Sequence, residues 1–183
     1  MSVQIRIATF DDIPRFETLI TESVRALSAG YYSLQQIESA LVHVFGVDTQ
    51  LIADGTYFVV EADGQIAGCG GWSKRRTLYG GDKMKREEDN LLDPMTEASR
   101  IRAFFVHPDF ARRGIGRLLL DTCEQAAAEA GFTSLELAAT LPGQPLYTAC
   151  GFHILEHIES ALPDGIEVPI IRMGKSISPI QKS

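Results

Sequence analysis

Cysteine is scarce in this 183-residue chain, and its three positions are far apart. Cys69, Cys123 and Cys150 include no Cys-x-x-Cys pair, and their odd number does not suit a fully paired disulfide framework. The pattern excludes a disulfide-stapled scaffold and favours a reducing, cytoplasmic setting. We expect no metal site.

Long apolar runs and an excess of basic residues are also missing. No stretch of about 18 uncharged apolar residues is present, as a membrane-spanning helix would require, and residues 1–12 lack the apolar core of a signal peptide. The 17 lysines and arginines are outnumbered by 24 aspartates and glutamates, which gives a net charge of −7. This balance argues against a nucleic acid or a membrane as a partner.

What the chain does contain is typical of one folded unit. Hydrophobic residues make up 45% of the sequence and charged residues 22%, as in an ordinary globular protein. A length of 183 residues fits one domain with a sizeable core. Because no linker or internal repeat interrupts it, we expect a single domain over residues 1–176 and a flexible tail over residues 177–183.

Capping and turn signals divide the first half of the chain into short elements. Ser33 followed by Gln36 is a capping-box pattern, so a helix is expected to begin there, with Leu34 in its buried stripe. Asp63-Gly64 is a strong hairpin signal. The elements expected from these signals and from periodicity are a strand (3–8), two helices (13–27, 34–45) and two strands (56–62, 65–73).

The second half begins with an irregular stretch and then becomes ordered. Residues 74–98 are polar, rich in both charges and poor in periodicity, which is typical of a functional loop or of a solvated surface excursion. The later elements expected are strands (101–106, 133–139, 153–160, 168–176) and helices (114–130, and a short one after Pro145). The order β-α-α-β-β-β-α-β-α-β-β predicts a mixed α/β domain.

The sequence HPDFARRGIGRLLL (107–120) concentrates arginines around two glycines where a strand passes into a helix. The start of a helix presents free backbone N–H groups and a partial positive charge. Gly114 and Gly116 lack a Cβ, so a ligand can approach the main chain, and Arg112, Arg113 and Arg117 suit phosphate oxygens. The turn therefore predicts a phosphate site. The alternative is a plain turn with solvated arginines.

Two common phosphate motifs do not fit. The dinucleotide fingerprint G-x-G-x-x-G requires a third glycine where this chain has Leu119, and the G-x-x-x-x-G-K-[ST] loop is absent. Neither of these nucleotide-binding folds is indicated.

VHPDFARRGIGRLLL, followed about thirty residues later by LYTACGF, resembles the GNAT superfamily of N-acetyltransferases. The family signature [QR]-x-x-G-x-[GA], which wraps the pyrophosphate of acetyl-coenzyme A, falls on residues 111–116. Ala111 departs from the pattern, since it replaces Gln or Arg, and Arg112 or Arg113 is the candidate to supply the missing side chain. The order of elements matches the family over nearly the whole chain.

The resemblance implies a fold and a set of binding residues. The GNAT fold is a single mixed α/β domain with a central, mostly antiparallel sheet of six to seven strands and about four helices. The backbone of residues 104–106 would hold the pantetheine, and the turn would hold the phosphates. The implied acetyl-CoA-binding residues are Phe104, Phe105, Val106, Ala111, Arg112, Arg113, Gly114, Ile115, Gly116 and Arg117.

The resemblance also implies a reaction, the direct transfer of an acetyl group from acetyl-CoA to a primary amine. Tyr147 occupies the place of the family tyrosine that protonates the departing thiolate, and a phenol is protonated at neutral pH; its alternative role is that of a core aromatic residue. Glu97 is a weak candidate for the general base, Asp82 lies in the same stretch, and a water-mediated base is equally open. His107 is typical of a turn residue.

Three readings of the chain's function remain open at this point. The first is a cytoplasmic acetyltransferase for a small-molecule amine or, less favoured, a protein amine. The second is a non-catalytic module that binds or senses acyl-CoA, and the third is a plain interaction domain. Monomer and homodimer are both compatible with the sequence.

Overall fold

The computed structural model describes residues 1–85 and 88–180. Two parts of the sequence predictions therefore lie outside the described residues: positions 86–87 of the polar stretch and positions 181–183 of the expected tail. Within the tail, Ile177 donates a backbone hydrogen bond of 2.9 Å to the carbonyl of Thr133.

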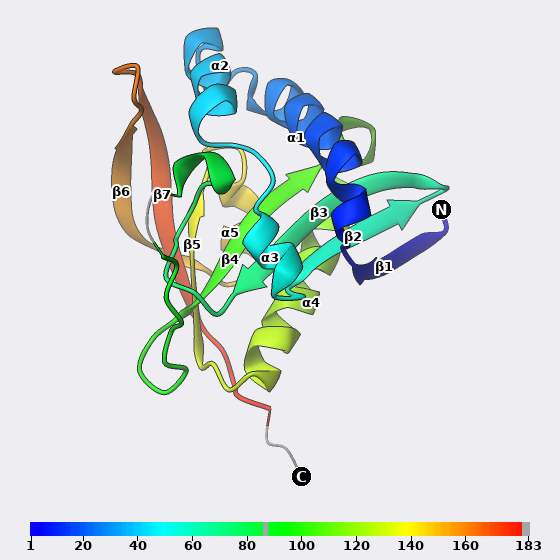
Figure 1. Cartoon of the computed structure of the whole chain (residues 1–183), viewed down its shortest axis with the longest axis vertical. Helices are drawn as coiled ribbons and strands as arrows, with labels where there is room; N and C mark the ends of the chain where they lie inside the picture. The colour runs from blue at the N-terminus through cyan, green and yellow to red at the C-terminus, as the bar shows by residue number, and fades with distance from the viewer. Residues whose placement is uncertain (86–87, 181–183) are drawn as a thin grey trace.

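A single seven-stranded sheet runs through the described residues, in the order β1-β2-β3-β4-β5-β7-β6 (Figure 1). Every neighbouring pair is antiparallel except β4 and β5, which are parallel. The mostly antiparallel sheet of the sequence prediction is confirmed. The strands are β1 (Val3–Ile7), β2 (Tyr57–Ala62), β3 (Gln65–Ser73), β4 (Ser99–Val106), β5 (Ser134–Ala139), β6 (His153–Ala161) and β7 (Glu167–Ser176).

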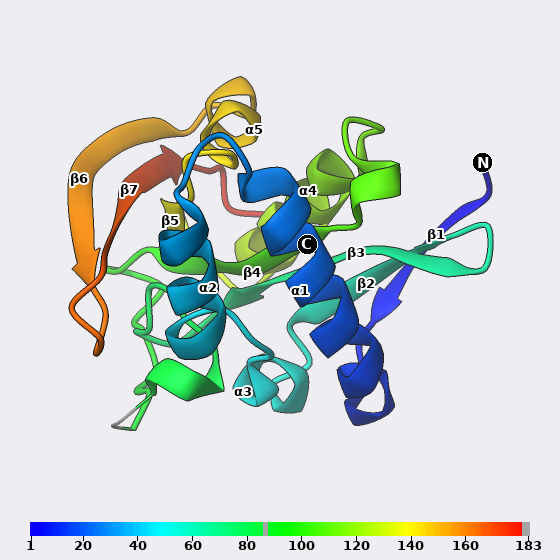
Figure 2. The ribbon, with the colours of Figure 1, turned by 90° about the horizontal axis from the view of Figure 1, so that it is seen from above.

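Helices cover both faces of this sheet (Figure 2). One core cluster joins the apolar sides of the first two helices to the sheet, and a second joins the later helices to its other face. The α-helices are α1 (Ile13–Ser28), α2 (Leu34–His43), α3 (Thr49–Ala53), α4 (Ile115–Glu129) and α5 (Gln144–Ala149), with short 3-10 turns at Phe10–Asp12, Asp82–Met84 and Pro108–Phe110. The expected mixed α/β domain is confirmed.

The local signals in the sequence act as expected. The Ser33 hydroxyl accepts the Gln36 N–H at 3.1 Å, and the Gln36 side chain accepts the Ser33 N–H at 2.9 Å, which completes the capping box of α2. Asp63 and Gly64 have φ angles of 50° and 81°, the left-handed pair that a two-residue hairpin needs. Gly131, with a φ of 95°, follows the end of α4.

One expectation is wrong, and one short helix was missed. Leu34 is 74% exposed and lies outside the buried stripe of α2, because it occupies the first helical position, where the side chain points away from the sheet. Helix α3 was not expected at all, since five residues are too few to show a 3.6-residue period.

The polar stretch 74–98 is held against the domain by inward-facing charges. Arg75 pairs with Asp54 at 2.7 Å, and Lys85 pairs with Asp48 at 2.6 Å. Asp48 is fully buried and also binds Arg102 of β4 at 2.9 Å. Thus one carboxylate ties the start of α3, strand β4 and the polar stretch together.

Strand β4 contains a bulge at its centre. Cys69 of β3 pairs with Phe105 and Gly71 pairs with Arg102, so that Ala103 and Phe104 together oppose one residue, Gly70. Ala103 has a φ of 54°, which is uncommon for a residue with a Cβ. The buried phenol of Tyr57 donates a hydrogen bond of 2.8 Å to the Ala103 carbonyl and so satisfies a group that the bulge leaves without a ladder partner.

Beyond the bulge, β4 and β5 separate. Their parallel pairing covers only Ser99 with Leu135 and Arg100 with Glu136. A gap therefore opens inside the sheet after Arg100, beside the part of β4 that carries the candidate residues Phe104, Phe105 and Val106.

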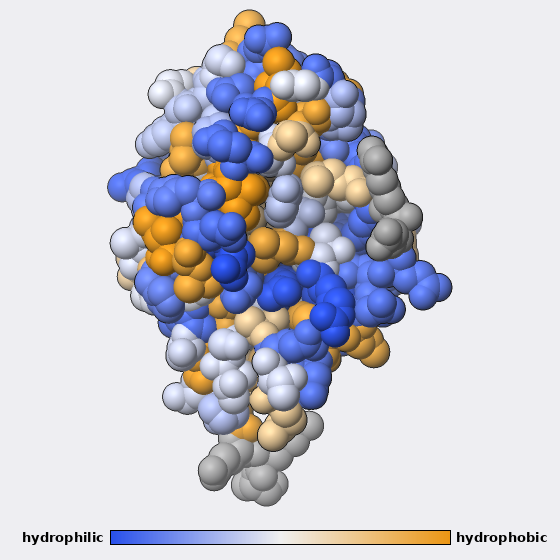
Figure 3. All heavy atoms as spheres, turned by 90° about the vertical axis from the view of Figure 1, so that its left-hand side faces the viewer, coloured by the Kyte–Doolittle hydropathy of each residue, from blue (hydrophilic) through white to orange (hydrophobic). Residues whose placement is uncertain are grey.

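On the side that carries β6 and the 74–98 stretch, hydrophobic and hydrophilic side chains are interspersed over the surface (Figure 3). Among residues 1–85 and 88–180, no helix combines the length and the apolar character needed to cross a membrane.

We predict that Tyr57→Phe lowers the free energy of unfolding by about 1–3 kcal/mol, because it leaves the Ala103 carbonyl without its donor. Urea denaturation measures this. Tyr31→Phe is the matched control, since the Tyr31 side chain is 54% exposed; it should change stability by less than about 0.5 kcal/mol. Equal stability of the two variants would contradict a role for Tyr57 in holding the bulge.

Candidate active site

The glycine-arginine turn connects β4 to α4 through two left-handed residues. After the 3-10 turn Pro108–Phe110, Arg112 has a φ of 64° and Gly114 a φ of 86°, and α4 begins at Ile115. No side chain caps this helix start. Its first backbone N–H groups therefore remain available to a ligand, and the helix dipole favours an anion there.

The arginines of the turn differ in position. Arg112 and Arg117 line a large cavity, whereas the guanidinium of Arg113 lies over the ring of Phe110, 5.7 Å from its centroid. All three are exposed, and none forms an ion pair with an acidic residue of the described chain. Arg112 and Arg117 are thus free to bind phosphate oxygens, while Arg113 packs on the turn.

Gly116 has a packing role in addition to the close ligand approach expected from the sequence. A Cβ at this position would lie 2.8 Å from Cδ2 of Leu146 in α5, so the missing side chain allows α4 and α5 to pack closely. At Gly114 a Cβ would meet no atom within 4 Å, and the left-handed φ is what requires glycine. Of the two glycines, Gly114 shapes the turn and Gly116 leaves room for the Leu146 side chain of α5.

One cavity of about 750 Å³ occupies the gap between β4 and β5. It passes from the glycine-arginine turn, along β4, to a region walled by α1 and by residues 78–81. Of the ten residues expected to bind acetyl-CoA, all except Arg113 line it, and so does Tyr147. The structure therefore brings together residues that are separated by more than thirty positions in the sequence.

The edge of β4 offers backbone groups to this cavity. The N–H of His107 bonds to the Ala67 carbonyl of β3 at 2.8 Å. Since neighbouring residues of a strand direct their backbone groups to opposite edges, those of Val106 and Phe104 point toward β5, which has already separated. This free strand edge can hydrogen-bond an extended, amide-containing chain.

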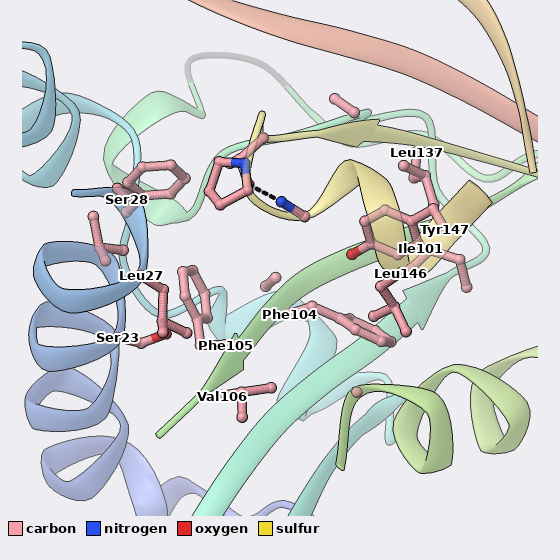
Figure 4. Close-up of a pocket in the computed structure, with 18 of the residues that line it drawn as sticks. Ser23, Leu27, Ser28, Ile101, Phe104, Phe105, Val106, Leu137, Leu146 and Tyr147 are labelled. Atoms are coloured by element: carbon pink, nitrogen blue, oxygen red, sulfur yellow. Dashed lines mark hydrogen bonds between the residues drawn. The ribbon is translucent and has the colours of Figure 1, made fainter. Parts of the chain in front are cut away.

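Tyr147 projects from α5 into the cavity, beside Leu146 and opposite Phe104 (Figure 4). Its ring packs against Phe104 and Phe152, with centroids 6.3 Å and 5.8 Å away. Only 8% of the residue is exposed, and burial raises the pKa of its phenol above the ordinary value. The hydroxyl makes no hydrogen bond to the described residues, so this protonated donor is free to act on a ligand.

The acidic candidates are not brought to the cavity. Glu97 binds Arg76 at 2.9 Å and accepts the backbone N–H of Asp93 at 2.7 Å, near the opposite end of β4. Asp82 accepts hydrogen bonds from the backbone and hydroxyl of Thr49. His107 is a turn residue, as expected: its Nδ1 accepts the N–H of Asp109 at 3.1 Å.

Three residues near the site were not found from the sequence. Tyr57 supports the bulge. The buried pair of Asp48 and Arg102 holds the segment that contributes residues 78–81 to the cavity wall, because Arg102 also donates to the carbonyls of Thr77 and Gly80. The sequence gives one partial signal: Asp48 before Thr49 is a helix N-cap pattern, and the Asp48 side chain accepts the N–H of Gln50. Its pairing across 54 positions has no local signal.

Comparison with known protein families identifies the fold. A family model described as the acetyltransferase (GNAT) family matches residues 21–152, which include the turn, the bulged strand and Tyr147. The chain belongs to the GNAT acetyltransferase family. The family resemblance noted from the glycine-arginine turn is thereby confirmed. None of the curated proteins matches the chain.

Solved structures share the GNAT architecture at low sequence identity. A GCN5-related N-acetyltransferase from Rhodopseudomonas palustris has a TM-score of 0.72 at 19% identity, covering 97% of both chains. PaiA N-acetyltransferase from Thermoplasma acidophilum, solved in complex with coenzyme A, has a TM-score of 0.64 at 15% identity and covers 96% of this chain and 99% of its own. A ribosomal-protein-alanine N-acetyltransferase from Brucella melitensis has a TM-score of 0.63 at 18% identity, covering 95% and 99%. At these identities the likeness shows the fold.

We predict that Gly116→Ala weakens acetyl-CoA binding and lowers the free energy of unfolding by no more than about 1 kcal/mol, because the new Cβ displaces the flexible end of the Leu146 side chain while the higher helix propensity of alanine offsets part of the cost. The double variant with Leu146→Ala should recover part of the loss, as a coupling energy of at most about 1 kcal/mol. Urea denaturation measures the stability, and calorimetric titration the acetyl-CoA affinity, of the wild-type protein, the two single variants and the double variant, which together form a double-mutant cycle.

Gly114→Ala is the control for this cycle. Its cost arises from a left-handed φ with open space around the new side chain, so Leu146→Ala should not relieve it. If Leu146→Ala rescued both glycine variants equally, or neither, close packing of α4 on α5 would not be the role of Gly116.

Proposed function

We propose that this protein transfers an acetyl group from acetyl-CoA to a small-molecule amine by direct attack in a ternary complex. The observation that carries the proposal is the single cavity that links the phosphate-binding turn, the free edge of β4 and the Tyr147 hydroxyl. A donor bound at the turn and along β4 would present its thioester beside Tyr147.

The residues present fit acetyl-CoA as the cosubstrate. The free N–H groups at the start of α4 and the guanidinium groups of Arg112 and Arg117 suit the diphosphate. The β4 edge at Phe104 and Val106 suits the amides of pantetheine. The thioester supplies the activated acetyl group, and the Thermoplasma relative, which holds coenzyme A, supports this placement by fold.

In this mechanism Tyr147 holds a proton at its hydroxyl for the departing thiolate. Because its pKa is raised by burial, the phenol stays protonated at neutral and mildly alkaline pH. General acid catalysis of this kind contributes about 10²–10⁴-fold to a rate. Strand β4 separates the donor from the region walled by α1, where the acceptor would enter (Figure 4).

A small acceptor is favoured over a protein because hydrogen bonds tie the walls around the far end of the cavity to one another. The Tyr32 hydroxyl donates to the Pro169 carbonyl at 2.7 Å and accepts the Leu141 N–H at 2.9 Å. The Tyr79 and Ser160 hydroxyls lie 3.0 Å apart. These contacts join the α1–α2 connection, the 74–98 stretch and the β6–β7 hairpin, which leaves little room for a polypeptide.

The proposal predicts that acetyl-CoA binds in calorimetric titration with micromolar affinity, whereas ATP and NAD do not. Arg112→Ala and Arg117→Ala should each raise the Kd by about fivefold, on the order of 1 kcal/mol. Arg15→Ala is the control, because it removes the same charge from a surface arginine paired with Glu61, outside the cavity. Failure to bind acetyl-CoA at millimolar concentration would refute the proposal.

Tyr147→Phe should lower kcat by about 10²-fold or more while the Kd for acetyl-CoA changes less than about twofold, since the ring packing survives and only the acid is lost. Assays of thiol release over time measure kcat. The acceptor in these assays is the amine, from a panel, that the wild-type protein acetylates fastest. An unchanged kcat would remove Tyr147 from the mechanism. If the Kd for acetyl-CoA rose by the same factor as kcat fell, Tyr147 would instead be assigned to acetyl-CoA binding.

A further inference from the structure

The end of the cavity that faces α1 is predominantly apolar and aromatic. We define the acceptor end by Ser23 and Leu27 of α1, Phe45, Tyr79 and Phe105, all of which line the cavity. The rings of Phe45 and Phe105 meet edge to face, with centroids 6.0 Å apart. In Figure 4, Ser23, Leu27 and Phe105 lie toward α1, at the opposite end of the drawn pocket from Tyr147. Such a lining suits a flat, apolar molecule.

The polar groups of the lining are neutral or positive. Within the described chain, the titratable side chains that line the cavity are three arginines and three tyrosines: Arg102, Arg112, Arg117, Tyr31, Tyr79 and Tyr147. Hydroxyl groups of Ser23, Ser28 and Thr140 complete the polar surface. The carboxylate of the buried Asp48 is already bound to Arg102 at 2.9 Å and to Lys85 at 2.6 Å.

This charge pattern discriminates between two kinds of amine. An alkylamine has a pKa of about 10.4 and would arrive as an ammonium ion, whose burial is costly unless an anion pairs with it. At the acceptor end it would lose its water and find no acidic side chain, among the described residues that line the cavity, to pair with it. An amine attached directly to an aromatic ring shares its lone pair with the ring, is neutral at pH 7 and can hydrogen-bond to hydroxyl groups without any ion pair.

We propose that the acceptor is an arylamine, a weakly basic amine on an apolar aromatic ring, which binds at the acceptor end between Phe45, Phe105 and Tyr79. The proposal rests on the acetyltransferase function proposed above and specifies its substrate class. It also accounts for the position of Glu97 away from the cavity: a neutral amine needs no base before it attacks.

The reaction balances with the amine, the thioester, the Tyr147 hydroxyl and water. The amine nitrogen forms a bond to the acetyl carbon, and the bond from that carbon to sulfur breaks. Tyr147 gives its proton to the thiolate, and the proton that the nitrogen loses returns to Tyr147 through water. The products are the N-aryl acetamide and the free thiol, with no net release of protons. An alkylammonium acceptor would release one proton for each acetyl group transferred.

The test compares para-toluidine with benzylamine, two isomers that share a ring and differ in the basicity of the nitrogen. With saturating acetyl-CoA at neutral pH, thiol release should give a kcat/KM for para-toluidine above that for benzylamine by about tenfold or more, equivalent to about 1.4 kcal/mol. Benzylamine as the equal or better acceptor would overturn the proposal, as would a failure of para-toluidine to react.

A charge introduced at Ser23 tests the physical cause. Ser23 lines the acceptor end, and only 4% of it is exposed. Ser23→Asp should shift the preference toward benzylamine by about tenfold, because the carboxylate supplies the missing partner for an ammonium ion. Ser23→Asn introduces a side chain of the same size as aspartate but without the charge, and it should keep the wild-type preference for para-toluidine. A shift of the same size in both variants would attribute the preference to shape and refute the electrostatic cause.

The titration with acetyl-CoA separates this inference from the proposed function. If acetyl-CoA binds and benzylamine is acetylated in preference to para-toluidine, the acetyltransferase function stands and the arylamine assignment fails. If acetyl-CoA does not bind, the proposed function fails first. Micromolar binding of acetyl-CoA by both Ser23 variants also shows that they are folded.

Discussion

The buried ion pair between Asp48 and Arg102 is the constraint on which the rest of the site depends. Their side chains are 0% and 1% exposed and lie 2.9 Å apart. A buried pair of this kind adds little stability compared with apolar side chains, but the loss of one partner leaves an unpaired charge in the core. It therefore acts mainly by fixing positions. Arg102 immediately precedes the left-handed Ala103, so the pair holds β4 at the residue where it bulges and β5 separates.

The bulge also assigns the two faces of β4 to two tasks. Because side chains alternate along a strand, Phe104 faces α5 and Tyr147, whereas Phe105 faces α1 and Phe45. The backbone between them is the free edge that a donor can bind. One strand thus supplies a wall for each substrate and a surface that keeps them in register, which direct transfer in a ternary complex requires.

The sequence predicted those parts of the fold whose cause is local. The capping box at Ser33 and the hairpin at Asp63-Gly64 depend on neighbouring residues, and both are present. The glycine-arginine turn could be recognised for the same reason. Ala103 could not, since alanine carries no signal for a φ of 54°; the bulge results from Tyr57 and Arg102, which meet it only in the folded chain.

The same limit applies to side chains whose partners are distant. The charged residues of the 74–98 stretch are compatible in the sequence with a functional loop or with a solvated surface excursion, and nothing local shows that Lys85 and Arg75 turn inward to carboxylates more than twenty positions away. Gly116 was recognisable as part of a phosphate motif, but its contact with Leu146 depends on how α5 packs on α4. Pattern and composition identify which residues can bind a ligand, whereas the geometry of the site follows from pairings between distant residues.

The charged side chains that line the cavity are distributed unequally between its two ends. A chain with a net charge of −7 would repel an anionic cosubstrate at long range, but charges farther away than about 8 Å are largely screened at physiological ionic strength. The arginines that line the cavity can therefore set the local potential, which attracts phosphate groups at the turn. At the acceptor end, by contrast, no acidic side chain among the described lining residues is available to pair with a cationic acceptor. A neutral amine needs no such partner, so donor recognition follows from the arginines at the turn and acceptor choice from the lack of a carboxylate at the other end.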